Sequence, residues 1–148
     1  MLIEISEQAI DVWTSLANYE NEHPELAGQH GASVVFAGRM RDFNENESVS
    51  QMHLEHYPGM SEKFLQDIVK RAMDDWSLMD ALVLHRVGKI KPADTIVVVA
   101  VWSAHRAHAY AANQFIMESL KSEAPFWKKE TLNDGQTRWV EKNTPGTV

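Results

Sequence analysis

The sequence predicts an α+β fold in which helices pack on a mixed sheet. The expected elements follow the order β-α-β-β-α-β-β-α-β-β, which mixes helical crossovers with hairpins. One segment, TIVVVAVW at Thr95–Trp102, is apolar almost throughout, as a central strand buried on both faces would be. No internal repeat or low-complexity linker divides the 148 residues, so we expect a single domain spanning residues 1–148.

In the N-terminal half, the first expected helix follows Ser6 as its N-cap. It would bury apolar residues at helical spacing, namely Ile10, Trp13, Leu16 and Ala17. The polar stretch Asn18–Gly31 is expected to be a connection, and the acidic segment Asp42–Ser48 a mobile loop. Alternating or compact apolar runs predict strands at Leu2–Ile5, Ser33–Ala37 and Val49–Tyr57.

In the C-terminal half, Ser61 is the expected cap of a second helix, whose apolar face carries Leu65, Ile68, Ala72 and Trp76. A strand is expected at Ala81–Val87, before the central strand. Helix-forming composition covers Ala104–Lys121, and Pro125 prevents further helix. Asn133-Asp134-Gly135 is a strong turn signal and predicts a hairpin with strands at Trp127–Leu132 and Gln136–Glu141.

Composition excludes several classes of protein. The formal net charge is -7, so the basic stripe typical of nucleic-acid binders is not expected. No apolar run approaches the ~20 residues that a membrane span needs, and the first residues do not resemble a signal peptide, so we expect a cytoplasmic location. Cysteine is absent, which excludes disulfides, thiolate metal sites and persulfide chemistry on this chain.

Basic residues gather at three element ends. Arg39 and Arg41 follow an apolar strand, with a spacing that points both the same way if the chain stays extended. His105 and Arg106 fall in the first turn of a helix, where backbone N–H groups favour an anion. Lys121 and Lys128 flank Pro125 at a third place. On an acidic chain, the three clusters predict one anion-binding site, although each alone also fits an exposed, solvated side chain.

A metal site is not expected. His53 and His56 are three residues apart on a strand and therefore face opposite sides. His105 and His108 have chelating spacing on a helix, but no third ligand is implied. No cofactor is expected either.

Two adjacent lysines, Lys128 and Lys129, stand on an expected strand, so one faces a cleft and the other solvent. The neighbouring Pro125, Phe126 and Trp127 could desolvate the lysine in the cleft and lower its pKa. A lowered pKa would suit proton transfer, whereas exposed lysine is the simpler interpretation.

Taken together, these segments resemble the large, catalytic subunit of molybdopterin synthase. The similar stretches run from Gly31 to Val140: GASVVFAGRMRD, LEHYPGMSEKFLQDIVKRA, LVLHRVGKI, VWSAHRAHAYAANQFIMESLKSEAPFWKKE and DGQTRWV. SAHR, then LK, then P-x-W-K-K-E is the most specific part. One departure is Met40, where the family usually has valine.

The resemblance implies a sulfurtransferase of molybdenum cofactor biosynthesis. Such an enzyme converts cyclic pyranopterin monophosphate into the molybdopterin dithiolene by inserting two sulfurs. The sulfur arrives as a thiocarboxylate on the C-terminal glycine of a small ubiquitin-like carrier subunit. The family forms a heterotetramer around a central homodimer of large subunits. Its fold is an α/β hammerhead with an added antiparallel β subdomain.

The resemblance also implies roles for individual residues. Lys121 would stabilise charge on the thiocarboxylate carbon, and Lys128 would exchange a proton with the pterin side chain. The substrate-binding residues implied are Arg39, Met40, Arg41, His105, Arg106, Lys121, Lys128, Lys129 and Glu130. Two other classes stay open: a non-catalytic scaffold that docks a ubiquitin-like protein, and a generic phosphate-ester binder or hydrolase. No P-loop or Ser/His/Asp spacing supports the hydrolase.

Overall fold

The larger of two sheets forms the body of the protein. The structure is a computed structural model that describes residues 1–140. The larger sheet has the strand order β1-β5-β7-β2, with bounds β1 Leu2–Ser6, β5 Asp80–Arg86, β7 Thr95–Ser103 and β2 Ala32–Arg39. β1 and β5 are parallel, whereas β5, β7 and β2 pair antiparallel, so the sheet is mixed.

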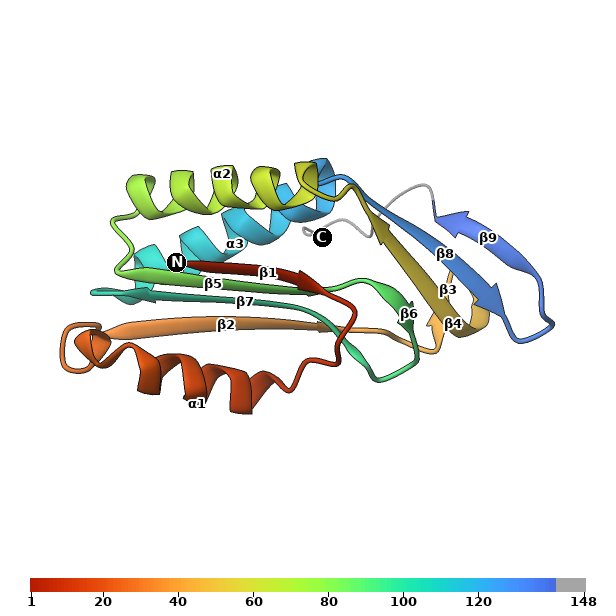
Figure 1. The fold of residues 1–148 in the computed structure, drawn as a ribbon, viewed down its shortest axis with the longest axis horizontal. Coiled ribbons are helices and arrows are strands. Elements are labelled where there is room, and N and C mark those ends of the chain that lie inside the picture. The colour runs from red at the N-terminus through yellow and green to blue at the C-terminus, as the bar shows by residue number, and fades with distance from the viewer. Residues whose placement is uncertain (141–148) are drawn as a thin grey trace.

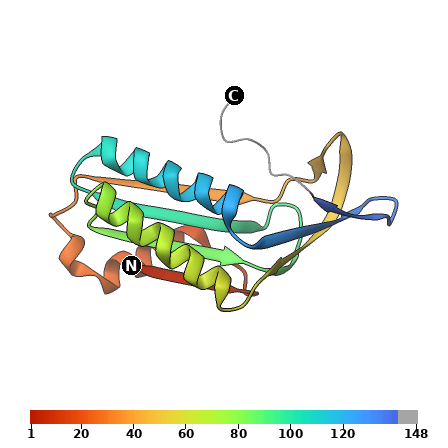
Figure 2. The ribbon, with the colours of Figure 1, turned by 90° about the horizontal axis from the view of Figure 1, so that it is seen from above.

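Helices cover both faces of this sheet (Figure 1). α2 (Met60–Asp75) and α3 (Arg106–Glu123) lie side by side on one face, as Figure 2 shows from above. α1 (Val12–Glu22) packs on the other face. Every residue of β7 is buried, which confirms the predicted central strand between two covered faces. Among the described residues, no helix is long and apolar enough to cross a membrane.

A second, antiparallel sheet extends from one end of the first (Figure 1). Its order is β3-β4-β8-β9, and the short β6 also pairs with β4; the bounds are β3 Phe43–Asn44, β4 Glu47–His56, β6 Gly88–Ile90, β8 Phe126–Leu132 and β9 Thr137–Val140. β8 and β9 form the predicted hairpin, with Gly135 at φ +86° in its turn. Of the predicted second strand, Glu141 lies outside the described residues. The α+β class and the antiparallel subdomain are confirmed.

The first helix differs from the prediction at both ends. Its N-cap is Asp11, whose Oδ1 accepts a hydrogen bond from the Thr14 amide at 3.1 Å. Ser6 instead ends β1, and its hydroxyl accepts from the Gln8 amide at 3.0 Å. The later start places Val12, Leu16 and Tyr19 on the buried face and leaves Trp13 67% exposed, so the predicted burial of Trp13 is wrong. The helix also continues to Glu22, and a short 3-10 turn follows at Pro24–Leu26, inside the stretch expected to be a connection.

α2 begins earlier than predicted, with Gly59 as its N-cap, and Ser61 lies inside the helix. Gly59 has no side chain to accept from the first helical amides, but its own amide donates to Glu62 Oε2 at 2.6 Å, which is the other half of a capping box. The fully buried Ser61 hydroxyl has another use: it accepts from the Tyr57 amide at 2.9 Å and donates to the Pro125 carbonyl at 3.0 Å. Ser61 thereby joins the end of β4 to the connection between α3 and β8.

The segment expected to be a loop, residues 42–48, contains a tight hairpin. β3 pairs with the start of β4 through Phe43↔Ser48 and Asn44↔Glu47. Glu45 and Asn46 form the turn, both at positive φ (52° and 63°). The prediction of a loop without strand pairing is wrong. The polar composition of the segment gave no sign of a two-residue strand, because the partners of its side chains lie elsewhere in the second sheet.

A buried amide fastens α3 to the larger sheet. Asn113 Nδ2 donates to the carbonyl of Val34 on β2 at 3.1 Å and to that of Val99 on β7 at 2.9 Å. Because α3 carries one wall of the site described below, this bond helps to position it.

We expect Asn113→Leu to lower the free energy of unfolding by about 1–3 kcal/mol, because two buried carbonyls lose a donor at nearly constant side-chain volume. The neighbouring Gln114 is exposed and provides the control Gln114→Leu. Urea unfolding of both variants measures the effect. Equal stabilities of the two variants would contradict the role assigned to Asn113.

Candidate functional site

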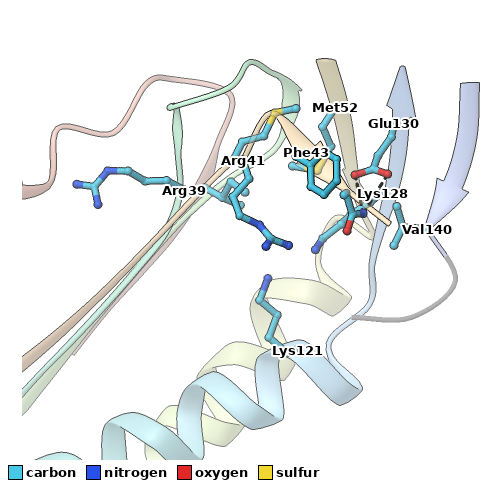
Figure 3. Close-up of a pocket in the computed structure, with 11 residues that line it drawn as sticks. Arg39, Arg41, Phe43, Met52, Lys121, Lys128, Glu130 and Val140 are labelled. Atoms are coloured by element: carbon cyan, nitrogen blue, oxygen red, sulfur yellow. Dashed lines mark hydrogen bonds between the residues drawn. The ribbon is translucent and has the colours of Figure 1, made fainter. Parts of the chain in front are cut away.

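Lys121 and Lys128 meet where α3 gives way to β8. Lys121 stands in the last turn of α3, which ends at Glu123 before Ala124 and Pro125. β8 begins at Phe126, so Lys128 is its third residue. The reversal at Pro125 brings the two side chains together from different elements, and their amines share a side-chain hydrogen bond. Figure 3 shows both lysines directed into one pocket.

The pocket is a basic cavity of about 180 Å³ between the two sheets and the end of α3. Its charged residues are Arg39, Arg41, Lys121, Lys128 and Glu130, four cations against one carboxylate. Its remaining walls are Met40, Phe43, Asn44, Met52, Ile96 and Val140. Positive charge is therefore concentrated here although the chain as a whole is acidic, which suits an anionic ligand.

Strand alternation decides which residues of β8 reach the pocket. Lys128 and Glu130 share one face and line the cavity. Lys129 lies on the opposite face, with its Nζ 5.6 Å from the ring centroid of Trp139, its cross-strand partner on β9. The prediction that only one of the two adjacent lysines faces the cleft is confirmed. The substrate-binding role expected of Lys129 has no support from its position, because its side chain points away from the cavity.

Arg39 and Arg41 do not point the same way, contrary to the extended-chain expectation. The register of β2 with β7 shifts between Gly38 and Arg39. Beyond it, Met40 pairs with the β6–β7 turn: its amide donates to the Asp94 carbonyl and its carbonyl accepts from the Ala93 amide, both at 2.9 Å. In Figure 3, Arg41 points toward the lysines and Arg39 points away, so the two arginines serve different sides of the pocket rim.

Burial perturbs both lysines. Desolvation, with the neighbouring positive charge of Lys128, lowers the pKa of Lys121 from 10.5 to about 8. Desolvation also lowers the pKa of Lys128, assisted by Arg41, while the charge of Glu130 and the bond to Lys121 act in the opposite direction. A fraction of Lys121 is therefore neutral near physiological pH, and an amine with a lowered pKa is suited to proton transfer.

A second cavity, of about 250 Å³, lies on the other side of the lysine pair. It shares Lys121, Lys128, Ile96 and Val140 with the first cavity, and its other walls are Leu54, His85, Leu120, Ser122, Ala124, Phe126 and Trp127. The two amines thus stand between a strongly basic compartment and one in which they are the charged residues, apart from the neutral His85. A group entering from each side would meet at the lysines.

His85 forms part of the second cavity and is neutral. Burial lowers its pKa to about 4, and the nearby Lys121 and Lys128 act in the same direction. The ring stacks on Phe126 with centroids 4.1 Å apart. Nδ1 is 2.9 Å from the Arg86 carbonyl, which can only accept, so Nδ1 carries the proton. Sequence reasoning missed His85, since a lone histidine on an apolar strand has no distinctive pattern.

His105 and Arg106 lie elsewhere. Both are exposed at the N-terminal end of α3, and His105 is the N-cap. Arg106 and Lys121 are 15 residues apart on this helix, or about 22 Å along its axis. The single chain therefore does not assemble all three basic clusters into one site, as the sequence led us to expect.

Sequence reasoning also missed the polar support of Glu130. Its carboxylate accepts from Asn44 Nδ2 at 3.0–3.1 Å and from Arg138 Nε at 3.1 Å. Asn44 belongs to the segment expected to be a loop, so no pattern linked it to a residue 86 positions away. Within residues 1–140, no group of three or more His, Asp or Glu side chains is placed to hold a metal ion.

The fold and pocket define a class of α+β protein with a basic cavity, suited to an anionic ligand, at two desolvated lysines. The sequence profile of the family described as MoaE protein matches residues 5–123. The molybdopterin synthase catalytic subunit of Ralstonia nicotianae is 51% identical over 139 residues, covering 94% of this chain and 76% of the relative. That of Escherichia coli is 50% identical over 122 residues, with 81% of each covered.

Solved structures agree. The molybdopterin biosynthesis MoaE protein from Burkholderia ambifaria is 41% identical, with a TM-score of 0.78 over 97% of this chain and 92% of that one. Molybdopterin synthase from Staphylococcus aureus is 30% identical, with a TM-score of 0.79 over 93% and 96%. The chain therefore belongs to the MoaE protein family.

The lowered pKa of Lys121 predicts a pH dependence of stability. In the unfolded chain its pKa is near 10.5, so between about pH 8 and 10.5 the unfolded state binds more protons than the folded state. The free energy of unfolding should therefore gain with rising pH over that window. We expect Lys121→Met to reduce this gain and Lys129→Met, on the outer face of β8, to preserve it. Urea unfolding across the window measures the difference, and an unchanged gain in Lys121→Met would refute the burial argument.

Proposed function

We propose that this chain is the catalytic subunit of a molybdopterin synthase. It transfers two sulfurs from the thiocarboxylated C-terminus of a small ubiquitin-like carrier to cyclic pyranopterin monophosphate, which yields the molybdopterin dithiolene. The observation that carries the proposal is the desolvated pair Lys121 and Lys128 in a basic pocket, within a family whose relatives are named molybdopterin synthase catalytic subunits. A docking scaffold would gain nothing from burying two lysines at a cost in stability.

The two cavities divide the reactants. The basic cavity, with Arg39, Met40 and Arg41 at its rim, takes the anionic pterin precursor. The second, less charged cavity beyond Lys121 and Lys128 takes the extended tail of the carrier. Because the chain contains no cysteine, each sulfur must enter on the carrier.

The lysines act at the junction of the two cavities. Lys121 stabilises the negative charge that develops on the oxygen of the carrier's terminal carbonyl when water adds to its carbon; the C–S bond then breaks, the sulfur stays on the pterin and the carrier leaves as a carboxylate. Lys128 exchanges a proton with the pterin side chain, a task suited to an amine whose pKa is lowered by burial. Glu130, on the same face of β8 as Lys128, completes the wall of the substrate cavity.

Lys121→Ala should abolish dithiolene formation without unfolding the protein, because a cation at a helix C-terminus contributes only about 1 kcal/mol. The matched control is Lys129→Ala, which removes a lysine on the opposite face of β8 and should retain activity. Both variants are incubated with thiocarboxylated carrier and precursor, and the dithiolene is quantified. Activity of folded Lys121→Ala near that of Lys129→Ala would overturn the assignment.

His105 and Arg106 enter the proposal through a second copy of the chain. They are too far along α3 to reach the lysines of their own subunit. We propose a central homodimer in which they hold the anionic end of the precursor bound to the partner subunit. Exposed N–H groups and the dipole at the start of α3 would add to this anion binding.

Mixed dimers test the shared site. Arg106→Ala should weaken precursor binding by roughly ten- to hundredfold, the loss expected for one charge-assisted contact. When Arg106→Ala and Lys121→Ala, each poorly active, are denatured and refolded together, each mixed dimer should contain one intact site. Activity should return to about one quarter of the wild-type value for random pairing. No recovery in mixtures shown to contain mixed dimers would mean that Arg106 does not act across subunits.

The carrier completes the assembly. A structure from Helicobacter pylori, 19% identical with a TM-score of 0.78, is described as a protein–protein complex of subunits 1 and 2 of molybdopterin-converting factor. A comparable pairing here would give a heterotetramer, with one carrier bound to each subunit of the homodimer. The reaction would take place in the cytoplasm.

A further inference from the structure

Arg138 forms the centre of a polar cluster behind the wall of the basic pocket. On one side its Nε donates to the buried Glu130 carboxylate at 3.1 Å, directly across the β8–β9 pair. On the other side its guanidinium donates to the Asn44 carbonyl at 2.9 Å and lies 3.4 Å from Glu45 and 3.7 Å from Glu47. One side chain thus fastens the β3–β4 hairpin to β8.

The same cluster reaches the pocket through other residues. Asn44 and Glu130 line the cavity, whereas Arg138 does not. Asn44 Nδ2 also donates to both Glu130 oxygens, and Figure 3 draws these bonds as dashed lines at the Glu130 carboxylate. Arg138 therefore touches the residues that shape the site but has no position from which to touch a ligand in it.

We propose that Arg138 is a positioning residue: it fixes the Glu130 carboxylate and the β3–β4 hairpin in place as one wall of the lysine pocket. The importance of Arg138 for catalysis rests on the function proposed above, but its effect on the pocket wall can be measured without any substrate. The hairpin carries Phe43 and Asn44 into the cavity, and a two-residue strand has too few ladder bonds to hold itself.

The charge of Arg138 matters as well as its shape. Four titratable or charged groups on different elements face Lys128. They are Glu130 on the same strand, Lys121 at the end of α3, Arg41 after β2 and His85 on β5. Among these, only Glu130 carries a negative charge that favours the Lys128 ammonium. Arg138, bonded to that carboxylate from behind, offsets part of its field, so the amine is held less firmly in its charged form.

This arrangement predicts that substitutions of Arg138 and of Glu130 shift the pKa of Lys128 in opposite directions. Arg138→Gln leaves Glu130 uncompensated and should raise the pKa of Lys128. Glu130→Gln removes a carboxylate whose charge raises the pKa of Lys128, so it should lower that pKa further. If Arg138 had a merely structural role, both variants would shift the pKa of Lys128 in the same direction, because both break the hydrogen bond between Arg138 and Glu130.

The test uses the complete chain without substrates. The pH dependence with which an amine-selective reagent labels Lys128, followed by peptide mass spectrometry, gives its pKa in each variant. Hydrogen exchange of residues 43–48 reports the hairpin, and we expect about tenfold faster exchange in Arg138→Gln. Arg138→Lys keeps the charge but not the forked geometry, so it should leave the pKa near the wild-type value while the hairpin exchanges faster.

Arg71→Gln is the control, because Arg71 is an exposed arginine on α2 whose contacts, an i,i+4 pair with Asp75 and a position over the Phe115 ring, lie outside the polar cluster. It should change neither readout. Shifts of the Lys128 pKa in the same direction in Arg138→Gln and Glu130→Gln, or wild-type exchange of the hairpin in Arg138→Gln, would overturn the proposal. If Arg138→Gln does not fold, the pair Arg138→Lys and Glu130→Gln decides by the same two readouts. None of these measurements involves sulfur transfer, so their outcome is independent of the proposed function.

Discussion

Burying two lysines against each other is the constraint on which the rest of the structure depends. Each amine would be more stable in water, and their mutual repulsion adds to the cost of removing them from it. The fold meets this cost with a rigid frame. Asn113 fastens α3 to two strands, and Ser61 fastens the Pro125 connection to α2 and β4. The two lysines cannot easily separate, because the elements that carry them are held at several points.

The two sheets divide the work of building the pocket. The larger sheet, covered on both faces, supplies a scaffold whose central strand is buried throughout. The smaller sheet supplies most of the polar wall, including Asn44, Lys128 and Glu130. Its outer strands, β3 and β9, pair over only two and four residues, and side-chain bonds such as those of Arg138 hold them in place. The candidate site thus lies where the larger, covered sheet meets a smaller sheet that is more easily adjusted.

Much of the fold could be predicted from the sequence, because strong local patterns coincide with the tertiary structure. β7 shows a continuous apolar run, α3 a helical composition ended by proline, and the β8–β9 hairpin an Asn-Asp-Gly turn. Weak patterns failed where a distant contact decided the outcome. Asp11 rather than Ser6 caps α1, and the polar segment at 42–48 pairs because Arg138 and Glu130 bind it.

The candidate site shows the same division. Lys121 and Lys128 could be predicted as a pair from their positions around Pro125, together with the family resemblance. The divergence of Arg39 and Arg41 could not, because it arises from a register shift against β7. The separation of Arg106 from the lysines could not be predicted either, since spacing along a sequence does not reveal which end of a helix faces a given pocket. The roles of all these residues in binding substrate stay predictions.

The shared wall between the two cavities couples ligands to protons. An anion beside Lys121 favours the ammonium form and so raises a pKa that lies near 8 in the empty protein. An anion in either cavity would therefore be accompanied by uptake of a proton from solvent. A second anion would then bind to lysines that are already charged. Two anionic ligands, one in each cavity, would in this way bind cooperatively, with the proton as the third participant in the equilibrium.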